Sequence, residues 1–269
     1  MRLLARMSVV LVLTAAACGK SSDNTDPAMT GSSSSGAQTT SDKVEPIDPA
    51  TVGSISGVVR LEGWLKGDNP TQPGVPYCAS LHPNGIPGET LVLGEGQAMA
   101  NVFVHVKSGL GRRKFPTPTT PVVLNQSRCV YSPHVVGLMT NQPLLVRNSD
   151  DTMHNVHGLP RLSAEFNRGQ GTKGQEDTFK LPMPELSVVV KCDVHPWMLA
   201  WVHVVEHPFY QVTGKDGAYS LAGLPPGTYE IEARHERFPN ASLIAQVKVG
   251  PKEDVKQPFT FKGGPEPKK

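Results

Sequence analysis

Long apolar runs are missing from this chain of 269 residues. The longest, at 7–17, has about eleven residues, whereas a membrane-spanning helix needs about 20. No long stretch repeats its apolar residues at the 3.6-residue period of an amphipathic helix. Charge of one sign is also scarce, because the formal net charge is +2. These absences argue against a helical membrane domain, a helix bundle and a protein that binds nucleic acid.

The first 18 residues, MRLLARMSVVLVLTAAAC, have the layout of a secretory signal. Arg2 and Arg6 precede the apolar run, and small residues lead from it to Cys18. The segment resembles the signal of bacterial lipoproteins. That resemblance implies lipidation of Cys18, attachment to a membrane through the lipid, and a location in the cell envelope, in the periplasm or at the outer membrane. The alternative is an ordinary cleaved signal with a chance cysteine.

Two terminal segments contain almost nothing large and apolar. Residues 19–50 are rich in Ser, Thr, Asp and Gly, and 263–269 are polar with Gly and Pro. Such segments bury too little surface to offset the entropy of ordering them. We therefore expect a disordered tether and a disordered tail. About 210 residues lie between them, enough for one or two domains.

The remainder reads as all-β. The chain has 25 prolines and 26 glycines, and its short apolar runs are bounded by turn residues, which predicts strands. The expected strands are 55–59, 102–106, 144–147, 187–191, 201–205, 228–234 and 243–249. This pattern favours a β-sandwich, or two of them.

Two motifs bring metal-binding residue types together. The first is the C-x2-H-x2-M loop 192–198, which lies between two expected strands. The second is the H-N-V-H segment 154–157, roughly forty residues upstream. Two imidazoles and a thiolate in a trigonal arrangement, with a weak axial thioether, suit copper as both Cu(I) and Cu(II). The candidate ligands are His154, Cys192, His195 and Met198.

Other readings of these residues are weaker. Zinc also binds Cys and His, but a structural zinc site usually takes four N or S ligands, and Met198 is a poor one. In an extended segment successive side chains alternate between faces. His157 then points away from His154, so we do not expect it to be a ligand.

The loop and the H-N-V segment resemble those of the cupredoxins, the type 1 (blue) copper proteins such as amicyanin and plastocyanin. This resemblance implies a Greek-key β-sandwich over 116–207 that holds one copper ion. It implies that Asn155 ties the two ligand-bearing loops together. It also implies that His195, flanked by Pro196 and Trp197, is the port through which electrons pass. The alternative for Trp197 is simple packing under the loop.

A second resemblance concerns the flanking regions. Residues 213–221 and 223–229 contain Asp-Gly and Pro-Pro-Gly turns that bracket short strands. They resemble the carboxypeptidase regulatory-like family, a small transthyretin-like β-sandwich whose opening strands are similar to 55–59 and 100–104. The resemblance implies a discontinuous domain, 51–115 with 208–262, into which the copper domain is inserted. The alternative is two sequential domains, with 55–106 in the copper domain.

Two further cysteines, Cys78 and Cys129, are most simply a disulfide. Their spacing to His82 and His134 also permits a second metal site, and free thiols are the third alternative.

The sequence predicts a one-electron carrier with a redox protein as its partner and no catalysis of its own. A multicopper oxidase or nitrite-reducing protein needs further histidines, commonly as H-x-H pairs, and the sequence has none. The remaining alternatives are a copper-storage or copper-delivery protein and a structural surface module with an incidental metal site.

Overall fold

The computed structural model of the protein describes residues 46–267. The expected signal, Cys18 and most of the expected tether therefore lie outside the described residues. Within 46–267, none of the helices is both apolar and long enough to cross a membrane.

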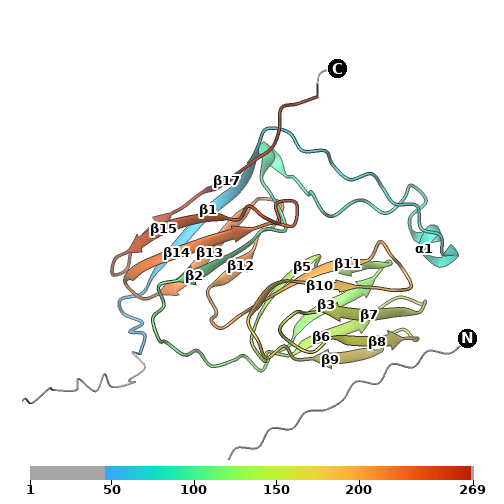
Figure 1. Ribbon diagram of the computed structural model, residues 1–269, viewed down its shortest axis with the longest axis horizontal. Helices are drawn as coiled ribbons and strands as arrows, with labels where there is room; N and C mark the ends of the chain where they lie inside the picture. Colours follow the sequence, from blue (N-terminus) through green and yellow to red (C-terminus); the bar gives the residue numbers. More distant parts are fainter. Residues whose placement is uncertain (1–45, 268–269) are drawn as a thin grey trace, which may run out of the picture. The chain divides into compact units, whose positions relative to one another are not determined.

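The expectation of an all-β protein is confirmed (Figure 1). Between residues 46 and 267 the helical elements are the short α1 (Pro76–Leu81) and one 3-10 turn (Glu95–Gln97). Each of the expected strands is present, extended by a few residues at one or both ends in most cases.

The strands nearest the two ends of the described chain form one β-sandwich, called here the terminal sandwich. One sheet contains β13 (Ala218–Leu224), β1 (Gly53–Glu62), β16 (Asp254–Lys256) and β17 (Phe259–Lys262). The other has the order β12 (Tyr210–Val212), β2 (Phe103–Ser108), β14 (Gly227–Arg234) and β15 (Leu243–Val249). Strands β1 and β2 thus pair with strands that follow the metal-ligand motifs in the sequence.

The strands between β2 and β12 form a second sandwich, called here the central sandwich. One sheet has the order β5 (Val135–Met139), β11 (Leu199–Val205), β10 (Glu185–Lys191), β7 (His154–Leu159) and β8 (Phe166–Gln170). The other has the order β4 (Val130–Ser132), β3 (Val122–Ser127), β6 (Leu144–Asn148) and β9 (Glu176–Phe179). In this sheet β3 and β6 run parallel, and in the first β5 and β11 do.

Each sandwich has its own apolar core. Ile55, Tyr229 and Ile231 are buried in the terminal core, and Leu124, Val190 and Val202 are buried in the central one. In β15 the alternation of side chains between the two faces of the strand decides which residues enter the core: Val247 and Val249 are buried, while Lys248 between them is exposed. The pattern that predicted the strands is therefore also the pattern that fills the cores.

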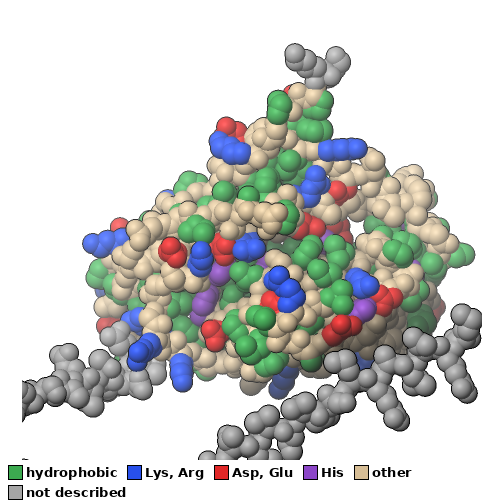
Figure 2. All heavy atoms as spheres, in the orientation of Figure 1, with side chains coloured by type: hydrophobic (Ala, Val, Ile, Leu, Met, Phe, Trp, Pro, Cys, Tyr) green, Lys and Arg blue, Asp and Glu red, His purple; other side chains and the backbone are tan. Residues whose placement is uncertain are grey.

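The two sandwiches contact each other through aromatic and charged side chains. The ring of Phe103 in β2 stacks on that of His203 in β11, with centroids 4.2 Å apart. His134 Nε2 lies 2.5 Å from Glu236 Oε1. On the face shown in Figure 2, cationic and anionic side chains are interspersed with apolar ones, so no broad field of one sign covers that face.

The segment between β1 and β2 extends from the terminal sandwich and packs against the central one. We call residues 64–97 the strap. Its helix α1 carries Cys78, which is buried in the central core. Tyr77 Oη accepts a hydrogen bond from the backbone N–H of Asp151, and His82 Nε2 lies 2.7 Å from the carbonyl oxygen of Arg128. The strap therefore covers part of the end of the central sandwich that carries the ligand motifs.

Two expectations at the chain ends need correction. The tail was expected to be disordered from residue 263, but Gly263 donates to the carbonyl of Glu62, and Gly264 pairs with Trp64. The tether was expected to extend to residue 50, but Asp48 closes a turn by accepting the backbone N–H of Ala50. Backbone hydrogen bonds in both places add order that composition alone does not indicate.

Candidate metal centre

The ligand motifs meet at one end of the central sandwich because each adjoins a strand end. Strand β7 begins at His154, shortly after the bend at 150–152. Strand β10 ends at Lys191, and the 192–198 loop leads directly into β11. The loop is closed by two backbone bonds: Met198 N–H donates to the carbonyl of His195, and Cys192 N–H donates to that of Met198. Since β7 pairs with β10, the two motifs become neighbours.

Three donor atoms converge there. One nitrogen each of His154 and His195 and the sulfur of Cys192 lie within 4.8 Å of one another. His154 Nδ1 is 2.9 Å from His195 Nδ1, which in turn is 3.6 Å from Cys192 Sγ. All three side chains are at most 2% exposed. Two unprotonated Nδ1 atoms this close would repel each other, so the arrangement requires a shared proton or a cation between them.

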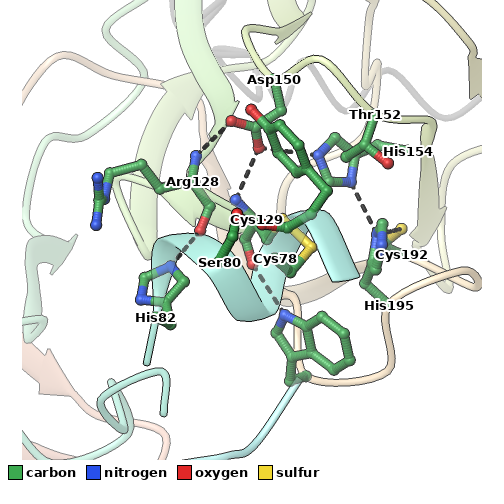
Figure 3. Close-up of a disulfide and its surroundings, with 12 residues drawn as sticks. Cys78, Ser80, His82, Arg128, Cys129, Asp150, Thr152, His154, Cys192 and His195 are labelled. Carbon is green, nitrogen blue, oxygen red and sulfur yellow. Dashed lines mark hydrogen bonds and ion pairs between the residues drawn. A yellow bond between two sulfur atoms is a disulfide. The ribbon is translucent and has the colours of Figure 1, made fainter. Parts of the chain in front are cut away.

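Asp150 sets the tautomer of His154. The Asp150 Oδ2 atom lies 3.0 Å from His154 Nε2 (Figure 3). An ionised carboxylate can only accept, so Nε2 carries the proton and Nδ1 is left free to bind a metal. Asp150 also accepts the backbone N–H groups of Arg128 and Cys129. Burial alone would raise the pKa of Asp150, but these hydrogen bonds outweigh burial and lower it.

The thiol of Cys192 is prepared to ionise. Burial alone would raise its pKa, but the contacts with the rings of His154 and His195 and with the backbone N–H of Asn155 outweigh burial and lower the pKa to about 6. The Asn155 N–H lies 3.4 Å from the sulfur. At neutral pH the side chain is therefore mostly a thiolate, the form that binds soft metal ions.

Asn155 joins the two ligand-bearing loops, in the place that the family resemblance implied. Its Oδ1 accepts the backbone N–H of Asp193 at 2.6 Å. Its Nδ2 donates to Asp193 Oδ2 and to Asn167 Oδ1. Asp193 also contacts Lys191 and His157, and the Lys191 contact is the main reason that its pKa is low. The loop before His195 is thus tied to β7 by several hydrogen bonds.

Met198 and His157 differ in their placement. Met198 is 1% exposed and belongs to the central core together with Cys192. His157 lies outside the group of converging donors, because its two ring nitrogens face Asp193 and Glu165, each at 2.8 Å. The alternation argument that set His157 apart from His154 agrees with these contacts.

The family resemblance implies that electrons pass through His195, but the ring of His195 does not reach the surface. His195 is fully buried, and its Nε2 has no hydrogen-bond partner among the described residues. The ring of Trp197 lies 5.1 Å from it, and Trp197 Nε1 donates to the carbonyl of Cys129. Trp197 is therefore packed against the central core, which was the alternative reading, while Pro196 is exposed.

Cys78 and Cys129 form a disulfide that joins the strap to the central sandwich. Neither sulfur is then a thiolate, so these residues do not form a second metal site with His82 and His134. His134 instead contacts Glu236 and Glu89. Figure 3 shows helix α1 beside this disulfide, with His154 and His195 in the same view.

Sequence reasoning missed two residues of this centre. Asp150 was given no role, although an acid four residues before a candidate ligand histidine is a usable signal. Tyr131 gave no signal at all. Its buried hydroxyl lies 3.0 Å from the carbonyl oxygen of Asn155 and 3.1 Å from that of Lys191 and can donate its one proton to either, so it bridges the strand ends that carry the donors. Burial raises the pKa of Tyr131 far above its ordinary value, so it remains a donor.

Comparison with known proteins gives a partial likeness in fold. No protein-family profile matches the sequence, and no curated protein matches it. Among solved structures, a copper-containing nitrite reductase from Thermus scotoductus is 18% identical, with a TM-score of 0.30, and the match covers 33% of this chain and 23% of that one.

Two smaller proteins also match. An amicyanin mutant in its Cu(I) form is 18% identical with a TM-score of 0.28, and the match covers 31% of this chain and 81% of that one. A purple cupredoxin from Nitrosopumilus maritimus is 17% identical with a TM-score of 0.27, covering 31% and 97%. At TM-scores this low the likenesses carry no argument about activity.

Proposed function

We propose that this protein is a type 1 copper electron carrier of the bacterial cell envelope. In this proposal His154, Cys192 and His195 are the strong ligands and Met198 is the weak axial one. The observation that carries it is the buried convergence of two imidazole nitrogens and one low-pKa thiol at the end of the central sandwich. We expect one copper ion and no catalysis by the chain itself.

The donor set supports copper over zinc. Two histidines and one cysteine with a buried methionine nearby suit copper in both oxidation states, so little must move when an electron arrives. Zinc prefers a fourth strong donor. The nearest carboxylate is that of Asp150, and it is already used by His154 and by two backbone N–H groups. Bound copper would supply a reversible one-electron centre.

The surroundings support transfer rather than open-site chemistry. All three donors are buried, and the hydrogen bonds of Asp150 and Asn155 hold them in place. A buried site whose ligands are held by hydrogen bonds lowers the rearrangement needed on electron transfer. Because His195 is covered, we propose that a redox partner docks near exposed apolar side chains next to the ligands in sequence, Met153 and Val194.

The remaining parts of the proposal rest on sequence resemblance. The terminal sandwich is proposed to be a carboxypeptidase regulatory-like module that acts as a stable spacer. A lipid on Cys18 is proposed to anchor the chain to a membrane.

Spectroscopy of the copper-loaded protein tests the function. We expect an intense visible thiolate-to-copper band in the oxidised protein, which one electron equivalent bleaches and reoxidation restores. Cys192→Ser should abolish this band. Met198→Leu should keep it and raise the reduction potential, because the weak axial donor is lost. Met183→Leu is the matched control, since Met183 is 46% exposed, and it should change neither property.

Three results would contradict the proposal. A Cys192→Ser variant that keeps the band shows that the ligand assignment is wrong. A protein that binds Cu(I), never forms the oxidised chromophore and passes its ion quickly to a copper-free acceptor is a delivery protein. A protein that stays colourless with added Cu(II) is a structural module.

A further inference from the structure

A cavity lies where the two sandwiches meet. Its volume is about 340 Å³, at the lower end of the range for small-molecule sites. Strands β5, β7, β10 and β11 of the central sandwich supply one side, and residues 234–239 after β14 supply the other. Trp201 and Phe238 give it aromatic walls. None of the proposed copper ligands lines it.

Two arginines line this cavity with most of their donors unused. Arg161 gives only its backbone N–H and Nε to Glu185, so both terminal nitrogens of its guanidinium lack a partner among the described residues. Arg234 gives only Nη1 to Glu232. A guanidinium group with two free N–H groups on one edge matches the two oxygens of a carboxylate.

Uncharged hydrogen-bond donors at the cavity also favour a ligand that carries acceptor oxygens. Trp201 Nε1 is buried and has no hydrogen-bond partner among the described residues. An unsatisfied buried donor costs about 1–3 kcal/mol, which an acceptor on a ligand can recover. The hydroxyl of Ser187, which also lines the cavity, has no hydrogen-bond partner within 46–267 either.

Ser187 lies at an irregular point of the wall. The pairing of β10 with β11 shifts register between Glu185 and Val188, and Ser187 in this bulge has a φ of 60°. A non-glycine residue held in the left-handed region costs about 1–3 kcal/mol, and such strain tends to occur at binding sites. The Ser187 backbone N–H is turned to His203 Nδ1 at 3.3 Å.

The one acidic side chain at the cavity is already engaged. Glu236 lines the cavity, but its carboxylate lies against His134, and the pair is almost fully buried. Burial alone would lower the pKa of His134, but the contacts with Glu236 outweigh it and raise the pKa, so the two charges offset each other. What remains available to a ligand is the guanidinium N–H groups that Arg161 and Arg234 do not give to Glu185 and Glu232.

From these observations we propose that the cavity binds a small organic carboxylate with a flat apolar body. The carboxylate binds at Arg161 and Arg234, and the apolar body lies between Trp201 and Phe238. This site is independent of the proposed copper centre and can be tested in protein with or without the metal.

The test uses the full chain labelled with ¹⁵N, copper-free or loaded with Cu(I), and follows the indole N–H signals of its three tryptophans. Benzoate is the probe, and benzylammonium, of similar shape and opposite charge, is its matched control. We expect benzoate to shift the Trp201 signal saturably, with a dissociation constant at or below about 10 mM. The signals of Trp64 and Trp197 should stay in place, and benzylammonium should shift none of the three.

Two variants identify the binding group. Arg161→Gln should weaken benzoate binding by about 10-fold, because a charged hydrogen-bonding partner is lost. The Arg161 side chain is 79% exposed, so this change should leave the fold intact. Arg168→Gln, an exposed arginine on β8 away from the cavity, should leave binding unchanged. Equal binding of benzylammonium, no saturable shift of Trp201 up to about 10 mM, or an unchanged affinity in Arg161→Gln would overturn the proposal.

Discussion

The terminal and central sandwiches are built from similar strands but use their interiors differently. The terminal core is a continuous set of aliphatic and aromatic side chains such as Ile55, Tyr229 and Ile231. The central core has the same character along most of its length, but at one end it contains Cys192 and Met198 beside the fully buried His154 and His195. One sandwich is therefore a scaffold, whereas the other is a scaffold that also buries a candidate metal site.

The difference shows what burying a set of polar donors requires. Buried polar groups need partners, because leaving one unpaired costs more than an average hydrogen bond contributes. At the central site Asp150, Asn155 and Tyr131 supply these partners, and each bridges two strand ends or turns. The terminal sandwich buries few polar groups, with Glu232 and His105 forming an ion-pair contact across β14 and β2.

Removal of the disulfide should have the largest effect on stability. Within residues 46–267 only the central sandwich has a disulfide, so its loss tests how far the two sandwiches differ. Replacing both Cys78 and Cys129 by alanine should lower the free energy of unfolding by about 4 kcal/mol, since the bond closes a loop of 51 residues. Denaturant unfolding of the copper-free protein measures this change.

A thiol-free phosphine reductant provides the control for that variant. It should destabilise the wild-type protein by a similar amount and leave the double variant unaffected. A loss below about 1 kcal/mol, small against the chain-entropy expectation, would mean that the contacts of Tyr77 and His82 hold the strap without the covalent bond.

Much of the fold could be predicted because short stretches of sequence determine where the strands and turns lie. Turn residues and short apolar runs located the seven strands that were expected, the first of them β1 and the last β15. The alternation of Val247 and Val249 with Lys248 is visible in the sequence. The parallel pairing of β3 with β6 and of β5 with β11 could not be predicted in this way. This pairing joins strands that are far apart in the sequence, and no local sequence pattern indicates which strands become neighbours.

The site was predictable only where its residue types are rare. Cysteine, histidine and methionine at short spacing identified the 192–198 loop, and the upstream histidine followed from the family pattern. The burial of His195 was not predictable, because it depends on Trp197 and on the Cys129 carbonyl to which Trp197 is bonded. Asp150 was missed for a similar reason: its role depends on facing a ring nitrogen, not on its own type.

A cavity in the terminal core should weaken the scaffold without affecting the site. Ile231→Ala should lower the free energy of unfolding by about 3 kcal/mol, because Ile231 is fully buried and its loss leaves a void. Copper binding by the folded protein should be unchanged. Ile244→Ala on the neighbouring strand is the matched control, since Ile244 is 48% exposed, and it should cost less than about 0.5 kcal/mol. A parallel loss of copper affinity in Ile231→Ala would show that the two sandwiches are coupled.

The junction between the sandwiches should make stability depend on pH through His203. Burial lowers the pKa of this side chain to about 3, with smaller contributions from His105 and Arg234. The unfolded chain takes up a proton near its ordinary value of about 6.5, but the folded state does not. Stability is therefore full above about pH 6.5 and falls as the pH drops toward 3, by about 2 kcal/mol at pH 5 for this one group.

Unfolding of His203→Gln at pH 7 and pH 5 isolates that contribution. The variant should lose about 2 kcal/mol less than the wild type between the two pH values, whatever its stability at pH 7. An identical pH dependence in the two proteins would mean that His203 is protonated in the folded state, and that its ring is less enclosed than its stacking on Phe103 indicates.

A change at Asp150 separates a residue that supports a ligand from a ligand itself. Asp150→Asn keeps the size of the side chain but only one of its two oxygens. The backbone N–H groups of Arg128 and Cys129 bond to different oxygens, so one of them loses its acceptor. The negative charge that polarises His154 is lost, so copper affinity should fall by about 10- to 100-fold. The visible band should persist at saturating copper and the reduction potential should rise, because His154 becomes a poorer donor to the oxidised ion. A competition titration and a redox titration measure the two quantities. If Asp150→Asn abolished the band altogether, as Cys192→Ser should, Asp150 would belong to the ligand set and the central site would need a different donor count.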